Sequence, residues 1–162
     1  MDPREHCISL LKVIKARELA HIEVRDWNKR LDKFFKVGAL LSSTATTYAV
    51  NVQDEEVDEM TLMMERTLAF STTVLSGLNV LLNNSCKAEK HAITAKKCTK
   101  LANILEVKIN SDNCTQADLD HFNHLYREDI LKDALTLSSW VIKRHPLVRG
   151  SQVTELQHLD SL

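Results

Sequence analysis

The near absence of helix-breaking residues is the feature that most limits how this chain can fold. Its 162 residues include only three glycines and two prolines, and the prolines, Pro3 and Pro146, stand near the two ends. No Asn-Gly, Asp-Gly or Gly-Gly pair marks a hairpin turn, and no sustained alternation of Val, Ile and Thr indicates strands. The sequence therefore predicts an all-α protein, a bundle of long helices.

Two long stretches without charge occupy the middle of the chain. Residues 37–53 and residues 67–86 contain no Asp, Glu, Lys or Arg. Each stretch has an apolar side and a side of Ser, Thr and Asn at helical spacing, which predicts two amphipathic helices. Because an acidic segment separates them, we expect a central helical hairpin over residues 37–86, within a single helical domain 1–146. A polar C-terminal tail, 147–162, follows.

The charges around the two stretches suggest a membrane. Residues 29–36 hold four basic side chains and residues 87–108 hold six lysines, whereas residues 54–66 carry six acidic side chains and one basic. Twenty helical residues span roughly 30 Å, the thickness of a bilayer core. Basic flanks outside an acidic connection would place both termini in the cytoplasm. This interpretation predicts a membrane-associated, non-enzymatic protein that oligomerises, as a pore or as an anchor in a larger assembly.

The polarity of the same stretches supports a second interpretation. Both are rich in Ser, Thr and Asn, and the mean hydropathy of the chain is −0.21. Such helices are typical of a soluble α-helical scaffold, cytoplasmic or within a virion, for example a minor structural component of a large DNA virus particle. In either case the expected partner is a second copy or another helical protein, with lipid as a further partner in the first. The sequence leaves both interpretations open.

Apolar residues at three- and four-residue spacing predict the contact surfaces. The hairpin is expected to present an oligomer or membrane face, and the helix over residues 87–109 a packing seam of small residues. The predicted oligomer or membrane face consists of Val37, Leu41, Tyr48, Leu68, Val74, Leu75, Leu78 and Leu82, and the α-helical packing seam of His91, Ala95, Cys98, Ala102 and Leu105.

Helix boundaries are marked at a few positions. Asp2-Pro3 is a helix start, with Asp as N-cap and Pro in the first turn. Thr115 and Asp118 have the spacing of a capping box, with Asp in place of the usual Glu. The helix that begins there is expected to run to about His145, where Pro146 ends it.

A long amphipathic helix is followed by a hydrophobic hairpin and then by the segment K-A-E-K-H-A-I-T-A-K-K-C-T-K-L-A-N-I-L-E. This layout, over roughly residues 5–145, resembles the SLATT family of two-transmembrane helical proteins. The resemblance implies a two-pass membrane protein that oligomerises, with a pore-forming effector role in prokaryotic members. The residues of that segment that carry it are His91, Ala92, Ala95, Leu101 and Leu105.

No residue pattern predicts an enzyme, a cofactor or a metal site. Asp118, His121, His124 and Glu128 lie within about three helical turns, but a second ligand pair is missing, so exposed or capping roles are expected instead. His91 is expected to be a hydrogen-bonded core histidine. The four cysteines lack paired spacing and are expected to be free thiols of a reducing compartment. The net charge is −1, so the chain lacks the basic excess of a typical nucleic-acid-binding protein, and no nucleic-acid partner is expected.

Overall fold

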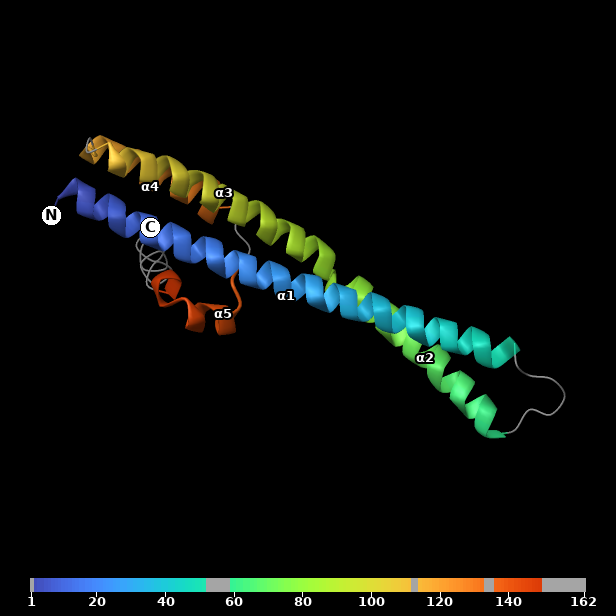
Figure 1. Cartoon of the computed structure of the whole chain (residues 1–162). Helices are drawn as coiled ribbons and strands as arrows, with labels where there is room; N and C mark the ends of the chain where they lie inside the picture. Colours follow the sequence, from blue (N-terminus) through green and yellow to red (C-terminus); the bar gives the residue numbers. More distant parts are fainter. Residues whose placement is uncertain (1, 52–58, 112–113, 133–135, 150–162) are drawn as a thin grey trace. The chain divides into compact units, whose positions relative to one another are not determined.

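Helices account for almost all of the chain that the structure describes. The structure is a computed structural model and describes residues 2–51, 59–111, 114–132 and 136–149. Its elements are α1 (Pro3–Asn51), α2 (Glu59–Leu82), α3 (Asn84–Asn110), α4 (Gln116–Leu125), the π-helix η1 (Tyr126–Leu131) and α5 (Ser139–Arg144) (Figure 1). No strand occurs among these residues, which confirms the all-α prediction.

Residues 1–146, expected to form one domain, belong to two compact units. The terminal unit consists of Met1–Asp26 and Ala88–Leu162, and the hairpin unit consists of Trp27–Lys87. Helix α1 begins in the first and ends in the second, and its 49 residues join the predicted N-terminal helix to the first uncharged stretch. The predicted polar tail lies mostly outside the described residues, although Val148 is described and fully buried.

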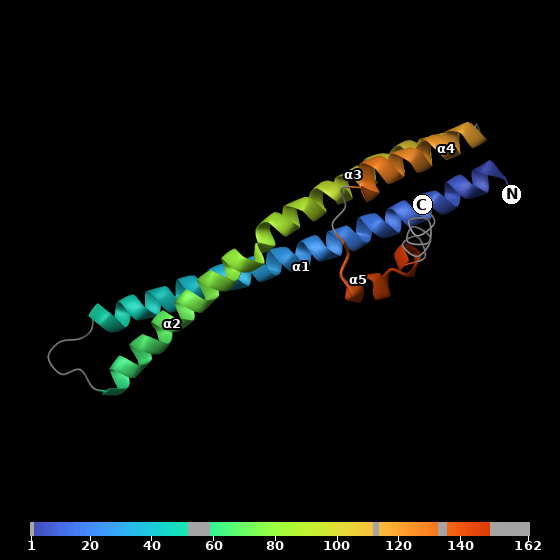
Figure 2. The same cartoon turned by 180° about the vertical axis from the view of Figure 1, so that it is seen from behind.

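The terminal unit contains both apolar cores of the described structure. In the larger core the start of α1 packs with α3, α4 and η1. Helices α3 and α4 lie side by side in both views (Figures 1 and 2). Its residues recur three and four positions apart on α3, so one face of that helix is buried. The larger core is made of Cys7, Ile14, Cys98, Leu101, Ala102, Leu105, Ile109, Leu119, Phe122, Tyr126 and Ile130.

The smaller core holds α5 against α1. Leu137 and Val141 are buried with Ala20 and Val24 of α1 and with Val148. Helix α4 becomes a π-helix after Leu125, and α5 is a separate helix, so the prediction of one helix up to His145 was wrong. The physical reason is this second core, because the chain has to leave the axis of α4 before Leu137 can reach α1. The predicted end before Pro146 is confirmed.

Polar contacts fix the neighbours of α3 in the terminal unit. Lys15 Nζ of α1 lies 3.2 Å from Glu106 Oε2 of α3, and Thr99 Oγ1 donates a 2.7 Å hydrogen bond to Glu18. At the start of α4 the capping box predicted from Thr115 and Asp118 is present. The first two contacts join α1 to α3 beside the larger core, and the capping box begins α4.

Candidate functional site

The hairpin unit packs through a narrow line of small and apolar residues. A β-carbon at Gly38 of α1 would come within 3.2 Å of Leu75 Cδ1 of α2, so the missing side chain allows this approach. Half-buried residues recur at three- and four-residue spacing on both helices, as expected where two helices meet. They include Leu31, Phe35, Gly38, Ser42 and Ala45 of α1, and Leu68, Thr72, Leu75 and Asn79 of α2.

Helix α2 contains no buried residue, although apolar side chains are spread along its 24 positions. Of the 22 large apolar side chains exposed in the described part of the chain, 17 belong to the hairpin unit. Leu81 is 82% exposed and Phe70 70% exposed. Monomeric proteins expose single apolar residues routinely, whereas a concentration of them on one unit is a pattern typical of interaction surfaces.

Eight of these 17 exposed apolar residues lie on two stripes, one along each helix of the hairpin. Along each stripe the positions alternate between three- and four-residue spacing, which is the spacing of residues that pack between helices in coiled coils. Every member of both stripes is exposed. The α1 stripe is Phe34, Val37, Leu41, Thr44 and Tyr48, and the α2 stripe is Met63, Thr67, Phe70, Val74, Gly77 and Leu81.

The hydroxyl groups of the hairpin bond to their own helices. Thr44 Oγ1 donates to the carbonyl of Leu40 at 2.9 Å, and Ser71 Oγ donates to that of Thr67 at 2.8 Å. The same bond, four residues back, is made by Thr46, Thr47, Thr67, Thr72 and Thr73. A donor with an internal acceptor loses less when water is removed from it. These hydroxyl groups can therefore be covered by another helix at low cost.

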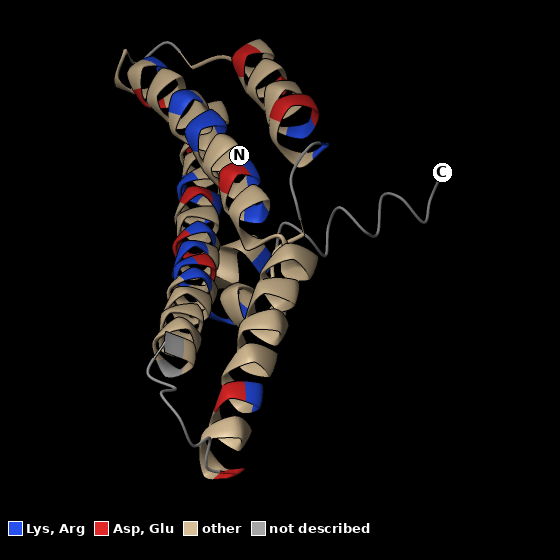
Figure 3. Ribbon diagram, turned by 90° about the vertical axis from the view of Figure 1, so that its right-hand side faces the viewer, with Lys and Arg blue, Asp and Glu red and all other residues tan. Residues whose placement is uncertain are grey.

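Charge is confined to the two ends of the hairpin unit. Helix α2 carries only Glu59, Glu65 and Arg66, near its start, and the rest of it is uncharged (Figure 3). Basic side chains gather on the part of α1 between residues 29 and 36, where Lys36 Nζ lies 2.7 Å from Asp32. The hairpin therefore has a basic end, an uncharged middle and an acidic end.

The structure divides the residues of the predicted oligomer or membrane face. Leu68 and Leu75 are half-buried, and Leu75 packs on Gly38 of α1. The other six are exposed, and Val37, Leu41, Tyr48 and Val74 belong to the stripes. The remaining two exposed members are Leu78 and Leu82.

All five residues of the predicted packing seam on α3 are buried. Cys98, Ala102 and Leu105 lie in the larger core, and Ala95 is 4% exposed. The Nδ1 atom of His91 lies 2.8 Å from the Nδ1 atom of His21 on α1. The pKa of His91 is lowered by burial, as expected for a neutral core histidine.

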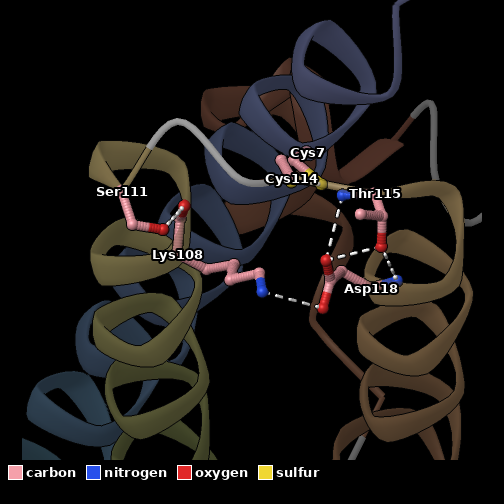
Figure 4. A network of polar contacts seen from close by, with 6 residues as sticks. All are labelled: Cys7, Lys108, Ser111, Cys114, Thr115 and Asp118. Atoms are coloured by element: carbon pink, nitrogen blue, oxygen red, sulfur yellow. Dashed lines mark hydrogen bonds and ion pairs between the residues drawn. The ribbon is translucent and has the colours of Figure 1, made fainter.

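Asp118 is a capping residue at the start of α4. Its carboxylate accepts hydrogen bonds from the Thr115 hydroxyl at 2.7 Å and from the Thr115 N–H at 2.9 Å, and Lys108 Nζ lies 3.2 Å away (Figure 4). These bonds lower the pKa of Asp118 to about 2. His121, His124 and Glu128 are exposed. In the described part of the chain no three His, Cys, Asp or Glu side chains are grouped to hold a metal ion.

Comparison with known proteins provides no relative. No protein-family model, curated protein or solved structure matches the chain. The resemblance to the SLATT family therefore stays a prediction. Among the described residues, no helix combines the length and the hydropathy that a bilayer crossing needs.

Two long-range pairs have no counterpart in the sequence analysis. His21 lies beside His91, and Cys7 Sγ lies 2.7 Å from Cys114 Sγ, although 107 positions separate the two cysteines. Neither pair follows a short spacing rule, because each is brought together by the packing of α1 with distant helices. The only available signal was that Cys7 and His21 fall on the side of α1 that carries Ile14.

Proposed function

We propose that this protein is a non-enzymatic structural protein that assembles with a second copy of itself through the hairpin unit. The observation that carries the proposal is the exposure of α2, which has an apolar stripe along its length and no buried residue. A stripe at coiled-coil spacing gains stability when a second helix covers it, because burying a side chain such as Leu or Phe contributes roughly 1.5–3 kcal/mol.

A second copy suits this surface better than a single helix from another protein. The hairpin unit presents two stripes, one on each helix, and each stripe needs a helix to cover it. Another hairpin supplies two helices with the same stripes, and a two-fold axis lets each copy cover the other with one self-complementary surface. The proposed assembly is a layer of four helices made from two hairpins.

Charge complementarity favours an antiparallel arrangement of the two hairpins. The basic end of one copy, with Arg30 and Lys33, then lies beside the acidic end of the other, with Glu59 and Glu65. A parallel arrangement would place like charges together at both ends, which is unfavourable. The uncharged middle sections meet in either case, so the charges select the direction while apolar contact supplies the affinity.

Light scattering of the purified protein in detergent-free buffer tests the proposal. We expect the mass of two chains at micromolar concentration, and the mass of one chain for Phe70→Glu and Leu81→Glu. Val107→Glu is the matched control, because Val107 is 71% exposed but lies in the terminal unit. A single-chain mass for the unmodified protein at about 100 µM would overturn the proposal, because this concentration exceeds the Kd values typical of specific dimers.

A parallel experiment with lipid vesicles separates self-assembly from the membrane interpretation. Protein that remains a single chain in buffer, but binds vesicles through residues that Phe70→Glu disrupts, would replace the proposal with a membrane role. Protein that forms the two-chain species and leaves phosphatidylcholine–phosphatidylserine vesicles unbound supports the proposal. Circular dichroism of each variant shows whether the helices are retained.

A further inference from the structure

Cys7 and Cys114 form a pair of thiols close enough to bond. Their Sγ atoms are 2.7 Å apart, and both residues belong to the terminal unit. A disulfide bond has a sulfur–sulfur distance of about 2.05 Å, so the two atoms need to approach by only about 0.7 Å. Both cysteines are free thiols in this structure.

Each thiol is held in place by its surroundings. Cys7 is fully buried in the larger core, on the second turn of α1. Cys114 directly precedes the capping box of α4, in which Thr115 and Asp118 bond to each other and Lys108 of α3 lies 3.2 Å from Asp118 (Figure 4). The two sulfurs therefore lie where the buried start of α1 meets the segment that leads into the capped start of α4.

We propose that Cys7 and Cys114 are a redox modification site, at which a low-molecular-weight disulfide such as oxidised glutathione converts the two thiols into a reversible disulfide bond. The thiolate of Cys114 attacks one sulfur of oxidised glutathione, which forms a mixed disulfide and releases one glutathione thiolate. Cys7 then loses its proton and attacks Cys114 Sγ, which releases the second glutathione. Two protein thiols and one oxidised glutathione thus yield one protein disulfide and two reduced glutathiones.

The surroundings of the two thiols decide the order of these steps. Cys114 is only half-buried and is the sulfur that a small disulfide reaches first. Burial, the bond from Cys114 and the nearby Asp118 carboxylate raise the pKa of Cys7 to about 12, so Cys7 is a poor first nucleophile. It acts as the resolving thiol because its target sulfur is already in contact.

The other two cysteines lack this arrangement. Cys98 is fully buried, and burial raises its pKa to about 12. Cys86 lies in the hairpin unit and is half-buried. Neither is paired with a second sulfur in the described structure. They therefore provide internal controls for thiol reactivity.

The disulfide would tie the start of α1 to the start of α4. It closes a loop of more than a hundred residues, and cross-links of long loops restrict the unfolded chain most strongly. We expect the oxidised terminal unit to melt about 5–15 °C above the reduced one. This consequence is independent of self-assembly through the hairpin unit.

Mass spectrometry of the full-length protein tests the proposal. The variant Cys86→Ser/Cys98→Ala is treated with oxidised glutathione, quenched in acid and labelled with a maleimide. We expect no label, no bound glutathione and a peptide pair that joins residue 7 to residue 114, all reversed by dithiothreitol. Cys7→Ser should keep glutathione on Cys114, and Cys114→Ser should stay largely unmodified.

Other outcomes contradict the proposal. Two labelled thiols after oxidation, or a lasting glutathione adduct on Cys114 with Cys7 still free, would show that the pair does not close. A disulfide that the native protein keeps after treatment with dithiothreitol would show that the bond is not reversible. If Cys7→Ser fails to fold, the unsubstituted pair and Cys114→Ser still decide the question, with melting temperature as the second measurement.

Discussion

Leu75 of α2 lies directly against the backbone of α1 at Gly38, where a β-carbon would stand 3.2 Å from Leu75 Cδ1. This is the closest described approach of the two helices at a glycine, because a β-carbon at Gly77 would meet no atom within 4 Å. The two glycines of the hairpin thus have different roles. Gly38 permits packing within the hairpin, whereas Gly77 lies on the exposed α2 stripe with open space around it.

Replacement of Gly38 by leucine should loosen the hairpin. The larger side chain must displace Leu75, and overpacking of this kind costs about 1–3 kcal/mol. Hydrogen–deuterium exchange should become faster in the amides of α2, at residues 68–79. Gly77→Ala is the matched control and should slow exchange, because alanine favours a helix over glycine by about 1 kcal/mol. Equal protection of α2 in both variants would contradict the role of Gly38.

The stability of the terminal unit should fall as the solution becomes acidic. The Nδ1 atoms of His21 and His91 are 2.8 Å apart, so one ring must accept the bond as a neutral base. Burial, His91 and the positive Arg17 lower the pKa of His21 from 6.5 to about 3. The unfolded chain binds the proton first, so stability is complete above pH 6.5 and declines towards pH 3. Guanidinium unfolding at pH 7.5 and pH 5 should differ by about 2 kcal/mol from His21 alone.

A double replacement identifies the histidines responsible for this pH dependence. His21→Leu/His91→Leu removes both partners of the bond, which avoids an orphaned polar group, and should flatten the stability profile between pH 7.5 and 5. His121→Leu, at an exposed histidine, should leave the profile unchanged. A profile that keeps its slope in the double variant would assign the effect to other groups.

Glu23 of α1 should hold α5 against α1 within the terminal unit. Burial alone would raise the pKa of Glu23, but hydrogen bonds from His145 and from Arg144 outweigh it and lower the pKa. Glu23→Gln should cost up to about 1 kcal/mol and speed hydrogen exchange at residues 141–144. The control is Glu128→Gln, whose 3.2 Å contact with Lys132 lies on the surface of η1. Exchange in α5 that is equally fast in both variants would argue against this role.

Charge reversal at the basic end of the hairpin should weaken self-assembly. If two hairpins pair antiparallel, Arg30→Glu/Lys33→Glu places acidic groups beside the acidic end of the other copy. We expect Kd to rise roughly tenfold, which corresponds to about 1.4 kcal/mol, and the difference to shrink at high salt. Lys90→Glu on α3 is the control. An unchanged Kd with retained assembly would exclude the antiparallel direction while leaving self-assembly in place.

Several local features could be predicted because they depend on neighbours along the chain. The capping box at Thr115 and the helix end before Pro146 follow from side-chain and ring chemistry within a few residues. The burial of Cys98, Ala102 and Leu105 follows from their spacing on one helix face. The break between α4 and α5 could not be predicted in this way, because its cause is the contact of Leu137 and Val141 with α1.

The sequence by itself determined the helices and the two uncharged stretches, since few breakers and a helical spacing of apolar residues act locally. Only the tertiary structure decided which apolar residues are covered. It buries one face of α3 in the terminal unit but leaves every residue of α2 at least partly exposed. It also brings Cys7 to Cys114 and His21 to His91. The physical reason is that contacts between distant segments depend on how whole helices pack, which no spacing along the chain specifies.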